Sequence, residues 1–146
     1  MKKQYILLVE DNSDDQELTL MALRQSNIAN EVVVVHDGVE ALEHLFGRGP
    51  SSDLGMNELP QVILLDLKMP RLGGLDVLKH IRSEQRTQLL PVVILTSSSE
   101  EEDILSSYRL GANSYVRKPI EFRRFAEAIQ QLGLYWLIVN QAPPLR

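Results

Sequence analysis

The stretch VILLDLKMP, residues 62–70, sets the pattern for the whole chain. Its first four residues are apolar, which predicts a strand buried on both faces, because a half-buried strand would alternate apolar and polar residues. An acid, Asp66, follows this strand at once, and Pro70 then marks a loop. The stretch therefore predicts a buried strand that ends on a carboxylate.

The same arrangement recurs along the chain, with strand-like and helix-like segments in strict alternation. Apolar runs predict four further strands, at residues 5–9, 32–35, 91–95 and 114–116. Apolar residues at helical spacing predict five helices, over residues 13–26, 39–46, 75–81, 100–110 and 122–132. Such alternation predicts an α/β fold with a parallel sheet covered by helices on both faces. Right-handed crossovers favour a flavodoxin-like, doubly wound (βα)5 sheet of five strands in the order 2-1-3-4-5.

Local signals mark where the helices begin and end. Ser13 with Gln16 fits a capping box for the first helix, and Ser99 is placed to cap the fourth. Gly111 predicts the end of that fourth helix. Residues 47–60, rich in glycine and proline, predict a long surface loop.

Composition excludes several classes of protein. The 146 residues are 44% hydrophobic and 24% charged, which is the balance of a globular domain. A net charge of −5 without a basic stripe argues against nucleic-acid binding, and the absence of cysteine excludes disulfides and thiolate zinc sites. No apolar run reaches membrane-spanning length, so we expect a cytoplasmic protein with no membrane partner. His36, His44 and His80 have no metal spacing and are expected to lie on the surface.

Polar residues follow four of the predicted strands at the same end. Glu10 and Asp11 follow the first strand, Asp66 follows the third, Thr96 ends the fourth, and Lys118 lies just past the fifth. Taken singly, each has an ordinary explanation: an acid can cap a helix or turn, a hydroxyl can satisfy the backbone, and a lysine can be solvated. The carboxyl ends of parallel strands meet at one edge of the sheet, where ligands bind in open α/β sheets. We therefore expect these side chains to gather in one site.

These residue types suit phosphoryl transfer. Three carboxylates held together repel one another and need a cation, and oxygen ligands suit Mg²⁺. A carboxylate such as Asp66 can attack phosphorus and form an aspartyl phosphate. A lysine and a hydroxyl can hold the oxygens of the transferred group. The sequence thus predicts a phosphoryl-transfer site without a nucleotide pocket.

Four motifs resemble the receiver domain of two-component response regulators, the chemotaxis-type domain. They are LLVED at residues 7–11, LLDLKMP at 64–70, ILTS at 94–97 and YVRKP at 115–119. The resemblance extends over residues 4–132 and suggests a receiver domain, 1–132, with a C-terminal extension, 133–146. It implies a phosphoacceptor rather than an enzyme, with only self-phosphotransfer and slow self-dephosphorylation.

The resemblance also implies how the acids share their work. Asp66 is implied as the phosphoacceptor and as a ligand of Mg²⁺. Asp11 is implied as a direct ligand of the ion, and Glu10 as a ligand through water. Many members of the family have aspartate in place of Glu10, and the longer side chain should alter the bound water more than the chemistry. The backbone carbonyl of Lys68 is implied as a further ligand.

Other residues are implied to sense the phosphoryl group. Thr96 matches the switch hydroxyl, Tyr115 matches the aromatic residue that moves inward with it, and Lys118 matches the lysine that pairs with phosphoryl oxygens. The peptide bond between Lys118 and Pro119 is expected to be cis. In this family, the positions of Lys68 and Ser98 tune phosphoryl lifetime. Neither residue is an acid or an amide, so a long-lived phosphoryl state is expected.

The C-terminal extension is dense in apolar residues from Leu134 to Val139. Two explanations stay open: the segment folds back on its own domain, or it forms a homodimer interface together with the last helix, since aromatic residues are favoured at interfaces. The loop 47–60 and this tail look similar to those of the small stand-alone regulators of bacterial phytochrome kinases. The similarity implies a sensor histidine kinase of the phytochrome type as phosphoryl donor, and a homodimer.

Three rival functions can be weighed against the same residues. An aspartate-nucleophile phosphatase or hydrolase of similar topology would usually carry a second acid at the position of Lys68. A nucleotide or flavin binder would need a glycine-rich phosphate loop where the chain has the acidic stretch 10–15. A degenerate receiver, serving only as an interaction module, is disfavoured because Asp66, Thr96 and Lys118 are all present.

Overall fold

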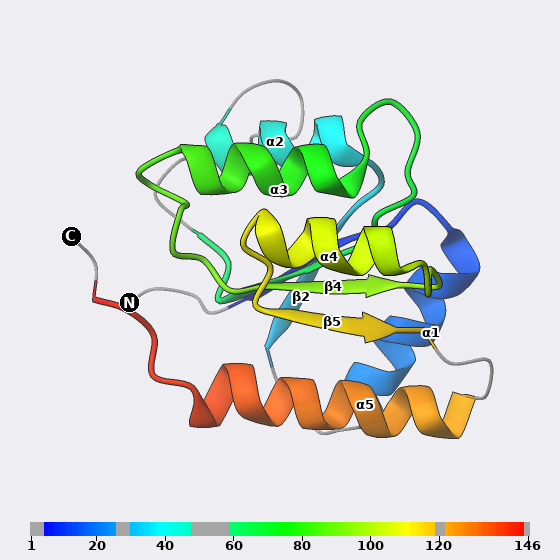
Figure 1. Cartoon of the computed structure of the whole chain (residues 1–146). Coiled ribbons are helices and arrows are strands. Elements are labelled where there is room, and N and C mark those ends of the chain that lie inside the picture. The colour runs from blue at the N-terminus through cyan, green and yellow to red at the C-terminus, as the bar shows by residue number, and fades with distance from the viewer. Residues whose placement is uncertain (1–4, 26–29, 48–58, 119–121, 145–146) are drawn as a thin grey trace.

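The computed structural model describes residues 5–25, 30–47, 59–118 and 122–144 (Figure 1). Its strands are β1 (Tyr5–Val9), β2 (Glu31–Val35), β3 (Val62–Leu65), β4 (Val92–Thr96) and β5 (Ser114–Arg117). Its helices are α1 (Ser13–Gln25), α2 (Gly38–Phe46), α3 (Gly74–Ser83), α4 (Glu101–Arg109) and α5 (Phe122–Leu134), followed by the π-helical turn η1 (Tyr135–Val139). The strands form one parallel sheet in the order β2-β1-β3-β4-β5, so the predicted fold and strand order are confirmed.

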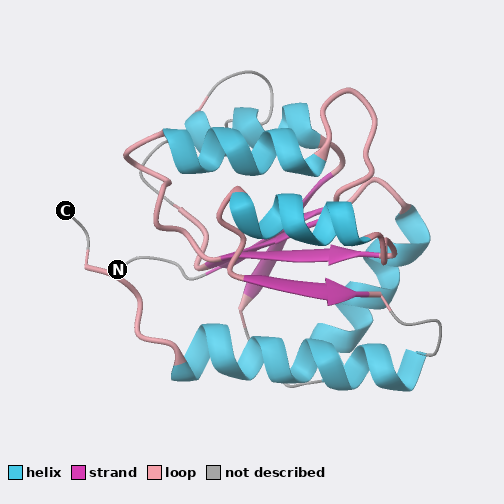
Figure 2. Cartoon of the chain, in the orientation of Figure 1, coloured by secondary structure: helices cyan, strands magenta, loops and turns pink. Residues whose placement is uncertain are grey.

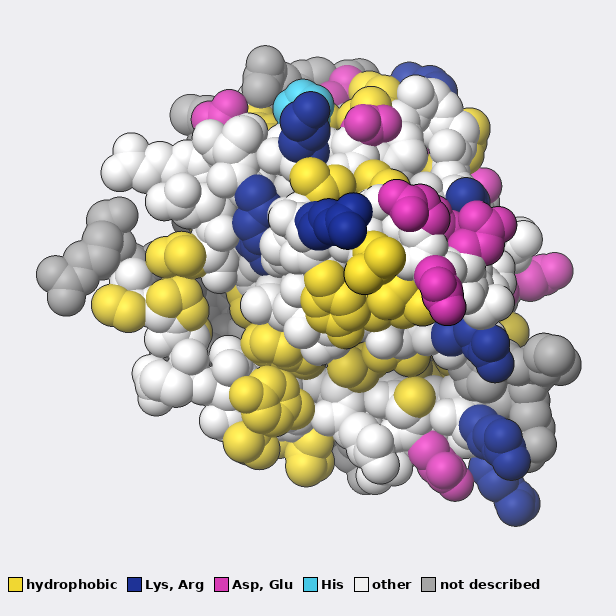
Figure 3. Space-filling model, viewed as in Figure 1, with side chains coloured by type: hydrophobic (Ala, Val, Ile, Leu, Met, Phe, Trp, Pro, Cys, Tyr) yellow, Lys and Arg dark blue, Asp and Glu magenta, His cyan; other side chains and the backbone are white. Residues whose placement is uncertain are grey.

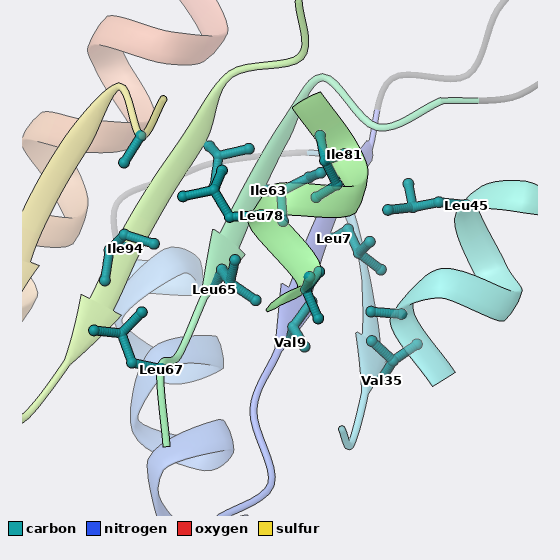
Figure 4. Close-up of a cluster of buried hydrophobic side chains, with 14 of the residues drawn as sticks. Leu7, Val9, Val35, Leu45, Ile63, Leu65, Leu67, Leu78, Ile81 and Ile94 are labelled. Carbon is teal, nitrogen blue, oxygen red and sulfur yellow. The ribbon is translucent and has the colours of Figure 1, made fainter. Parts of the chain in front are cut away.

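Helices cover both faces of the sheet, with α2, α3 and α4 on one face and α1 and α5 on the other (Figure 1, Figure 2). This arrangement explains why β1 is apolar throughout. Leu7 and Val9 point into the core beneath α2 and α3 (Figure 4), while Ile6 and Leu8 point into the core beneath α1 and α5. Both faces of the strand are buried, so neither set can be polar.

The predicted cap of the first helix is wrong. The amide of Asp15 donates to Asn12 Oδ1 at 2.9 Å, so Asn12 caps α1 and Ser13 is its first residue. The side chain of Gln16 does not reach back to Ser13 but donates to the carbonyl of Glu10 at 2.7 Å. The helix start is therefore tied to the end of β1, which holds the acidic residues 10 and 11 close to the sheet.

The start of α4 also differs from the prediction, whereas its end does not. Ser98 Oγ, rather than the side chain of Ser99, accepts a hydrogen bond from the amide of Glu100 at 3.3 Å. The helix ends at Arg109, and Gly111 adopts a φ of 100°, a conformation that L side chains rarely adopt. Gly111 therefore marks the end of this helix, as predicted.

One of the three histidines is buried, contrary to prediction. His44 is 5% exposed, and its Nε2 lies 3.0 Å from the hydroxyl of Tyr5. Its position on α2 explains this, because it follows Ala41 by three residues and so shares the inner face of the helix. His36 and His80 are exposed, as predicted.

Two predictions fall on residues that the structure does not describe. These are most of the loop 47–60 and the peptide bond before Pro119. Within the described ranges, no helix has both the length and the hydrophobicity needed to cross a bilayer.

The hydroxyl of Thr19 is a weak point in the packing of α1. The residue is fully buried, and its hydroxyl makes no hydrogen bond to any residue that the structure describes. Burying an unpaired hydroxyl lowers stability. We expect Thr19→Val, which keeps the shape of the side chain, to raise the free energy of unfolding by about 1 kcal/mol in urea titrations. Thr19→Ser, which keeps the hydroxyl and loses a methyl group, should lower it, and a less stable valine variant would contradict the prediction.

The C-terminal extension packs on its own domain only in part. Trp136 and Leu137 pack against the core beneath α1 and α5, and Gln61 Nε2 donates to the carbonyl of Leu137 at 3.2 Å. The other apolar side chains stay exposed: Leu134, Tyr135, Ile138 and Val139. Figure 3 shows hydrophobic side chains gathered near this end of α5. The described tail therefore combines self-packing with an exposed apolar surface.

Candidate functional site

Backbone pairing brings the predicted residues to one edge of the sheet. The amide of Asp66 donates to the carbonyl of Val9 at 3.1 Å, so the chain leaves β3 beside Glu10. The amide of Lys118 donates to the carbonyl of Thr96 at 2.7 Å, so the chain leaves β5 beside the end of β4. Because β1, β3, β4 and β5 are adjacent and parallel, the residues that follow them lie along one edge.

Three carboxylates form the centre of the site. Carboxylate oxygens of Glu10, Asp11 and Asp66 lie within 4.8 Å of one another. Glu10 and Asp66 are buried, whereas Asp11 is exposed, so the group has one open side. Negative charges at this spacing repel one another, and oxygen ligands beside solvent suit a small divalent cation that keeps part of its water. The structure thus brings together three of the predicted metal ligands, and their chemistry fits such an ion.

Lys118 is the counter-charge of these acids. Its Nζ donates to Glu10 Oε1 and, at 3.0 Å, to Asp15 Oδ2, and it lies 3.8 Å from Asp66 Oδ2. Burial alone would lower the pKa of Lys118, but the hydrogen bond to Glu10 and the charge of Asp66 raise it above its usual value. The ammonium group therefore stays charged at the edge of the site.

Burial also governs the most enclosed acid. Burial raises the pKa of Glu10 to about 7. The hydrogen bond from Lys118 acts to lower this pKa, and the negative charge of Asp66 raises it further. A buried carboxylate between a lysine and a second acid is stabilised in its charged form by any cation that binds there. The electrostatics of Glu10 thus favour cation binding at the same place as the donor geometry.

The two predicted switch residues are linked through Ser98. Thr96 is fully buried, and its Oγ1 accepts from the amide of Ser98 at 3.5 Å rather than bonding to Asp66. The hydroxyl of Tyr115 donates to the carbonyl of Ser98 at 2.9 Å, and its ring packs against the core beneath α2 and α3. The structure therefore brings Thr96 and Tyr115 into one hydrogen-bonded chain at the end of β4.

Two acids beside the site were not singled out from the sequence. Asp15 contacts Lys118, as described above. Its position in the first turn of α1, four residues after Asp11, could have indicated from the sequence that it lies near the site. Asp103 accepts from Ser98 Oγ at 2.6 Å and lies 3.5 Å from Lys68 Nζ. No local pattern marks Asp103, which lies on α4, because its partners come from the loops that follow β3 and β4.

The comparisons with known proteins agree with this geometry. A model of the response regulator receiver domain matches residues 6–130. The chain belongs to this family. The response regulator Rcp1 of Synechocystis sp. is 34% identical over 132 residues, which are 90% of this chain and 88% of Rcp1.

Solved structures of phytochrome response regulators are similar to this receiver over nearly its whole length. The phosphorylated cyanobacterial regulator RcpA is 35% identical with a TM-score of 0.88, covering 99% of this chain and 100% of RcpA. The Mn²⁺-bound form of Rcp1 is 33% identical with a TM-score of 0.87, covering 97% and 99%. The bacteriophytochrome response regulator RtBRR is 50% identical with a TM-score of 0.78, covering 99% and 86%. The receiver is therefore a homologue of phytochrome response regulators, which favours this family over the rival phosphatase.

Proposed function

We propose that this receiver accepts a phosphoryl group on Asp66 from a sensor histidine kinase, in the presence of Mg²⁺. The ion would be held by Glu10, Asp11, Asp66 and the backbone carbonyl of Lys68. The observation that carries the proposal is the position of Asp66, whose carboxylate lies within 4.8 Å of two other acids and 3.8 Å from Lys118 Nζ. The carboxylate of Asp66 is thus a nucleophile that lies beside both a cation site and a fixed positive charge.

The two oxygens of Asp66 are not equivalent. Oδ1 accepts a hydrogen bond from the amide of Leu67 at 2.8 Å, whereas Oδ2 faces Lys118. We therefore assign Oδ2 as the atom that bonds to phosphorus, while the bond from phosphorus to the donor histidine nitrogen breaks and its electron pair stays with the imidazole. Lys118 is placed to pair with an oxygen of the arriving group. The bound ion supplies further neutralisation of charge on the phosphoryl oxygens.

The response of the fold starts at Thr96. A phosphoryl oxygen on Asp66 would offer the Thr96 hydroxyl a charged acceptor, which is stronger than a neutral one. Turning toward it breaks the 3.5 Å contact with the amide of Ser98. Because Ser98 also bonds to Tyr115 and Asp103, the change reaches β5 and α4. We propose this surface and the adjacent tail as the output, with no catalytic activity beyond self-phosphotransfer and slow self-dephosphorylation.

The similarity to RcpA, Rcp1 and RtBRR supports a phytochrome-type kinase in the cytoplasm as the donor. The exposed part of the tail supports a homodimer. Leu134, Tyr135, Ile138 and Val139 are each about half exposed or more, and such contiguous apolar surface is usually covered by a partner. We propose residues 1–132 as the receiver and 133–146 as the extension that completes this dimer surface.

A phosphotransfer experiment tests the proposal. A phytochrome histidine kinase, autophosphorylated with radiolabelled ATP and freed of nucleotide, is mixed with this chain and Mg²⁺. We expect rapid transfer of label to the chain, none in excess chelator, and a mapped modification at Asp66 after reductive trapping of the acyl phosphate. Size measured before and after shows whether the chain dimerises. Label retained on the kinase would refute the proposed donor, and failure of acetyl phosphate to modify the chain would refute the acceptor.

A further inference from the structure

Arg71 has an unusual backbone conformation in the loop that follows the phosphoacceptor. Its φ is 64°, and it is the one non-glycine residue with positive φ among those that the structure describes. L side chains rarely adopt this region, and such outliers persist where the surrounding structure holds them for a purpose. Glycine adopts positive φ at little cost, so an arginine at this position calls for an explanation.

The side chain of Arg71 supplies that explanation. Its Nε and Nη2 both lie 2.8 Å from Oδ2 of Asp37, a buried residue that directly precedes α2. The other oxygen of Asp37 accepts from the amide of Glu40 at 2.9 Å and so caps α2. Burial would raise the pKa of Asp37, but the Glu40 amide and the Arg71 guanidinium outweigh it and lower the pKa below its usual value. Arg71 and Asp37 therefore form a charged pair, in which each oxygen of the Asp37 carboxylate accepts a hydrogen bond.

The next residues of the two segments are in contact as well. A Cβ at Gly38 would lie 2.3 Å from the carbonyl oxygen of Leu72, so the loop can approach α2 this closely only because position 38 is glycine. Asp37 and Gly38 thus hold Arg71 and Leu72 in register. Figure 1 shows the loop between β3 and α3 beside the start of α2.

The contact with Asp37 and Gly38 holds the second half of the β3–α3 loop, and the first half of the same loop forms part of the site. The loop starts at Asp66, and the amide of Gly74 closes it by donating to the carbonyl of Leu67 at 3.0 Å. Lys68, whose carbonyl is the proposed backbone ligand of the ion, lies inside this loop, three residues before Arg71. A ligand on a loop binds a cation tightly only if the loop is already ordered, because ordering it during binding lowers affinity.

We propose that Arg71 and Asp37 form a positioning pair that holds the β3–α3 loop in place and so preorganises its backbone carbonyl for the divalent cation beside Asp66. The proposal rests on the proposed function, since it assumes a cation at Glu10, Asp11 and Asp66. It assigns to two residues outside the site a role in metal affinity, which they exert without touching the metal.

Removing the arginine separates positioning from simple electrostatics, because the two predict opposite signs. Loss of a positive charge near an acidic site should strengthen cation binding, whereas loss of a positioning contact should weaken it. Arg71→Asn suits the test, because asparagine tolerates positive φ and the backbone can keep its conformation. We expect Mn²⁺ affinity, measured by the signal of free Mn²⁺ in electron paramagnetic resonance, to fall roughly tenfold.

Further variants make the result decisive. Arg109→Asn removes an exposed arginine from the last turn of α4 and should leave the affinity unchanged or slightly higher. Asp37→Asn, which can still cap α2, should weaken binding as Arg71→Asn does, and the double variant should be no weaker than the single ones. Wild-type affinity in Arg71→Asn would overturn the positioning role. No Mn²⁺ binding by the wild type would instead refute the metal site itself, and urea unfolding verifies that each variant is folded.

Discussion

Asp66→Asn is expected to abolish phosphorylation by acetyl phosphate and Mg²⁺, to below about a thousandth of the wild-type rate. The amide group lacks the nucleophilic carboxylate oxygen that faces Lys118. Asparagine has the same shape, and its Oδ1 can still accept the hydrogen bond from the amide of Leu67. Removing one of three like charges also relieves repulsion, so the free energy of unfolding should not fall. The loss is therefore chemical and not a consequence of unfolding.

The matched control is Asp14→Asn. Asp14 is an exposed acid in the first turn of α1, so the substitution makes the same change of charge close to the site. We expect this variant to gain one phosphoryl mass in intact mass spectrometry, as the wild type does. A phosphoryl group on the Asp66→Asn protein would move the acceptor to another acid, with Glu10 or Asp11 as the nearest.

Gly74→Ala is expected to lower the free energy of unfolding by about 1–3 kcal/mol and to weaken metal binding and phosphorylation with it. A Cβ at this position would lie 2.1 Å from the carbonyl oxygen of Asp66 and 2.8 Å from Cα of Leu67. Both are backbone atoms at the end of a buried strand, so they cannot move aside as a flexible side chain could. The start of α3 would have to shift away from the site.

The neighbouring glycine provides the control for this prediction. A Cβ at Gly73 would lie 3.3 Å from the carbonyl oxygen of Leu67, and the φ of Gly73 is −76°, which suits any L residue. We expect Gly73→Ala to change the free energy of unfolding, measured by urea titration, by less than about 1 kcal/mol, which is the effect of a substitution at a helix start. Equal destabilisation by both substitutions would show that the close approach at Gly74 is not the cause.

The sequence was sufficient to predict the five strands and the five α-helices, their order and the residues at the edge of the sheet, although not the π-helical turn η1. Buried parallel strands need apolar residues on both faces, so strands such as 5–9 and 62–65 can be predicted without any tertiary information. The parallel topology then places whatever follows each strand at the same edge. For that reason the proximity of Asp11 and Asp66 could be predicted from spacing alone.

Local signals were less reliable where several polar residues compete for one role. Asn12 and Ser13 are both good helix caps, as are Ser98 and Ser99, and the sequence cannot say which of two neighbours has the right backbone geometry. The structure selects Asn12 as the cap of α1, whereas α4 begins after Glu100, whose side chain makes no capping hydrogen bond, and Ser98 Oγ accepts from the Glu100 amide just before the helix. The buried His44 was missed because its helix face was judged by residue type, although its spacing from Ala41 indicated burial.

The sequence by itself determined the fold and which side chains gather at the site, because periodicity and strand ends are local properties that a parallel sheet converts into proximity. Only the tertiary structure decided which partners the polar side chains take. Lys118 bonds to Asp15 as well as to Glu10, and Arg71 reaches Asp37 across 34 positions of the chain. Such contacts depend on how loops from different parts of the chain pack against one another, and no local pattern of residues carries that information.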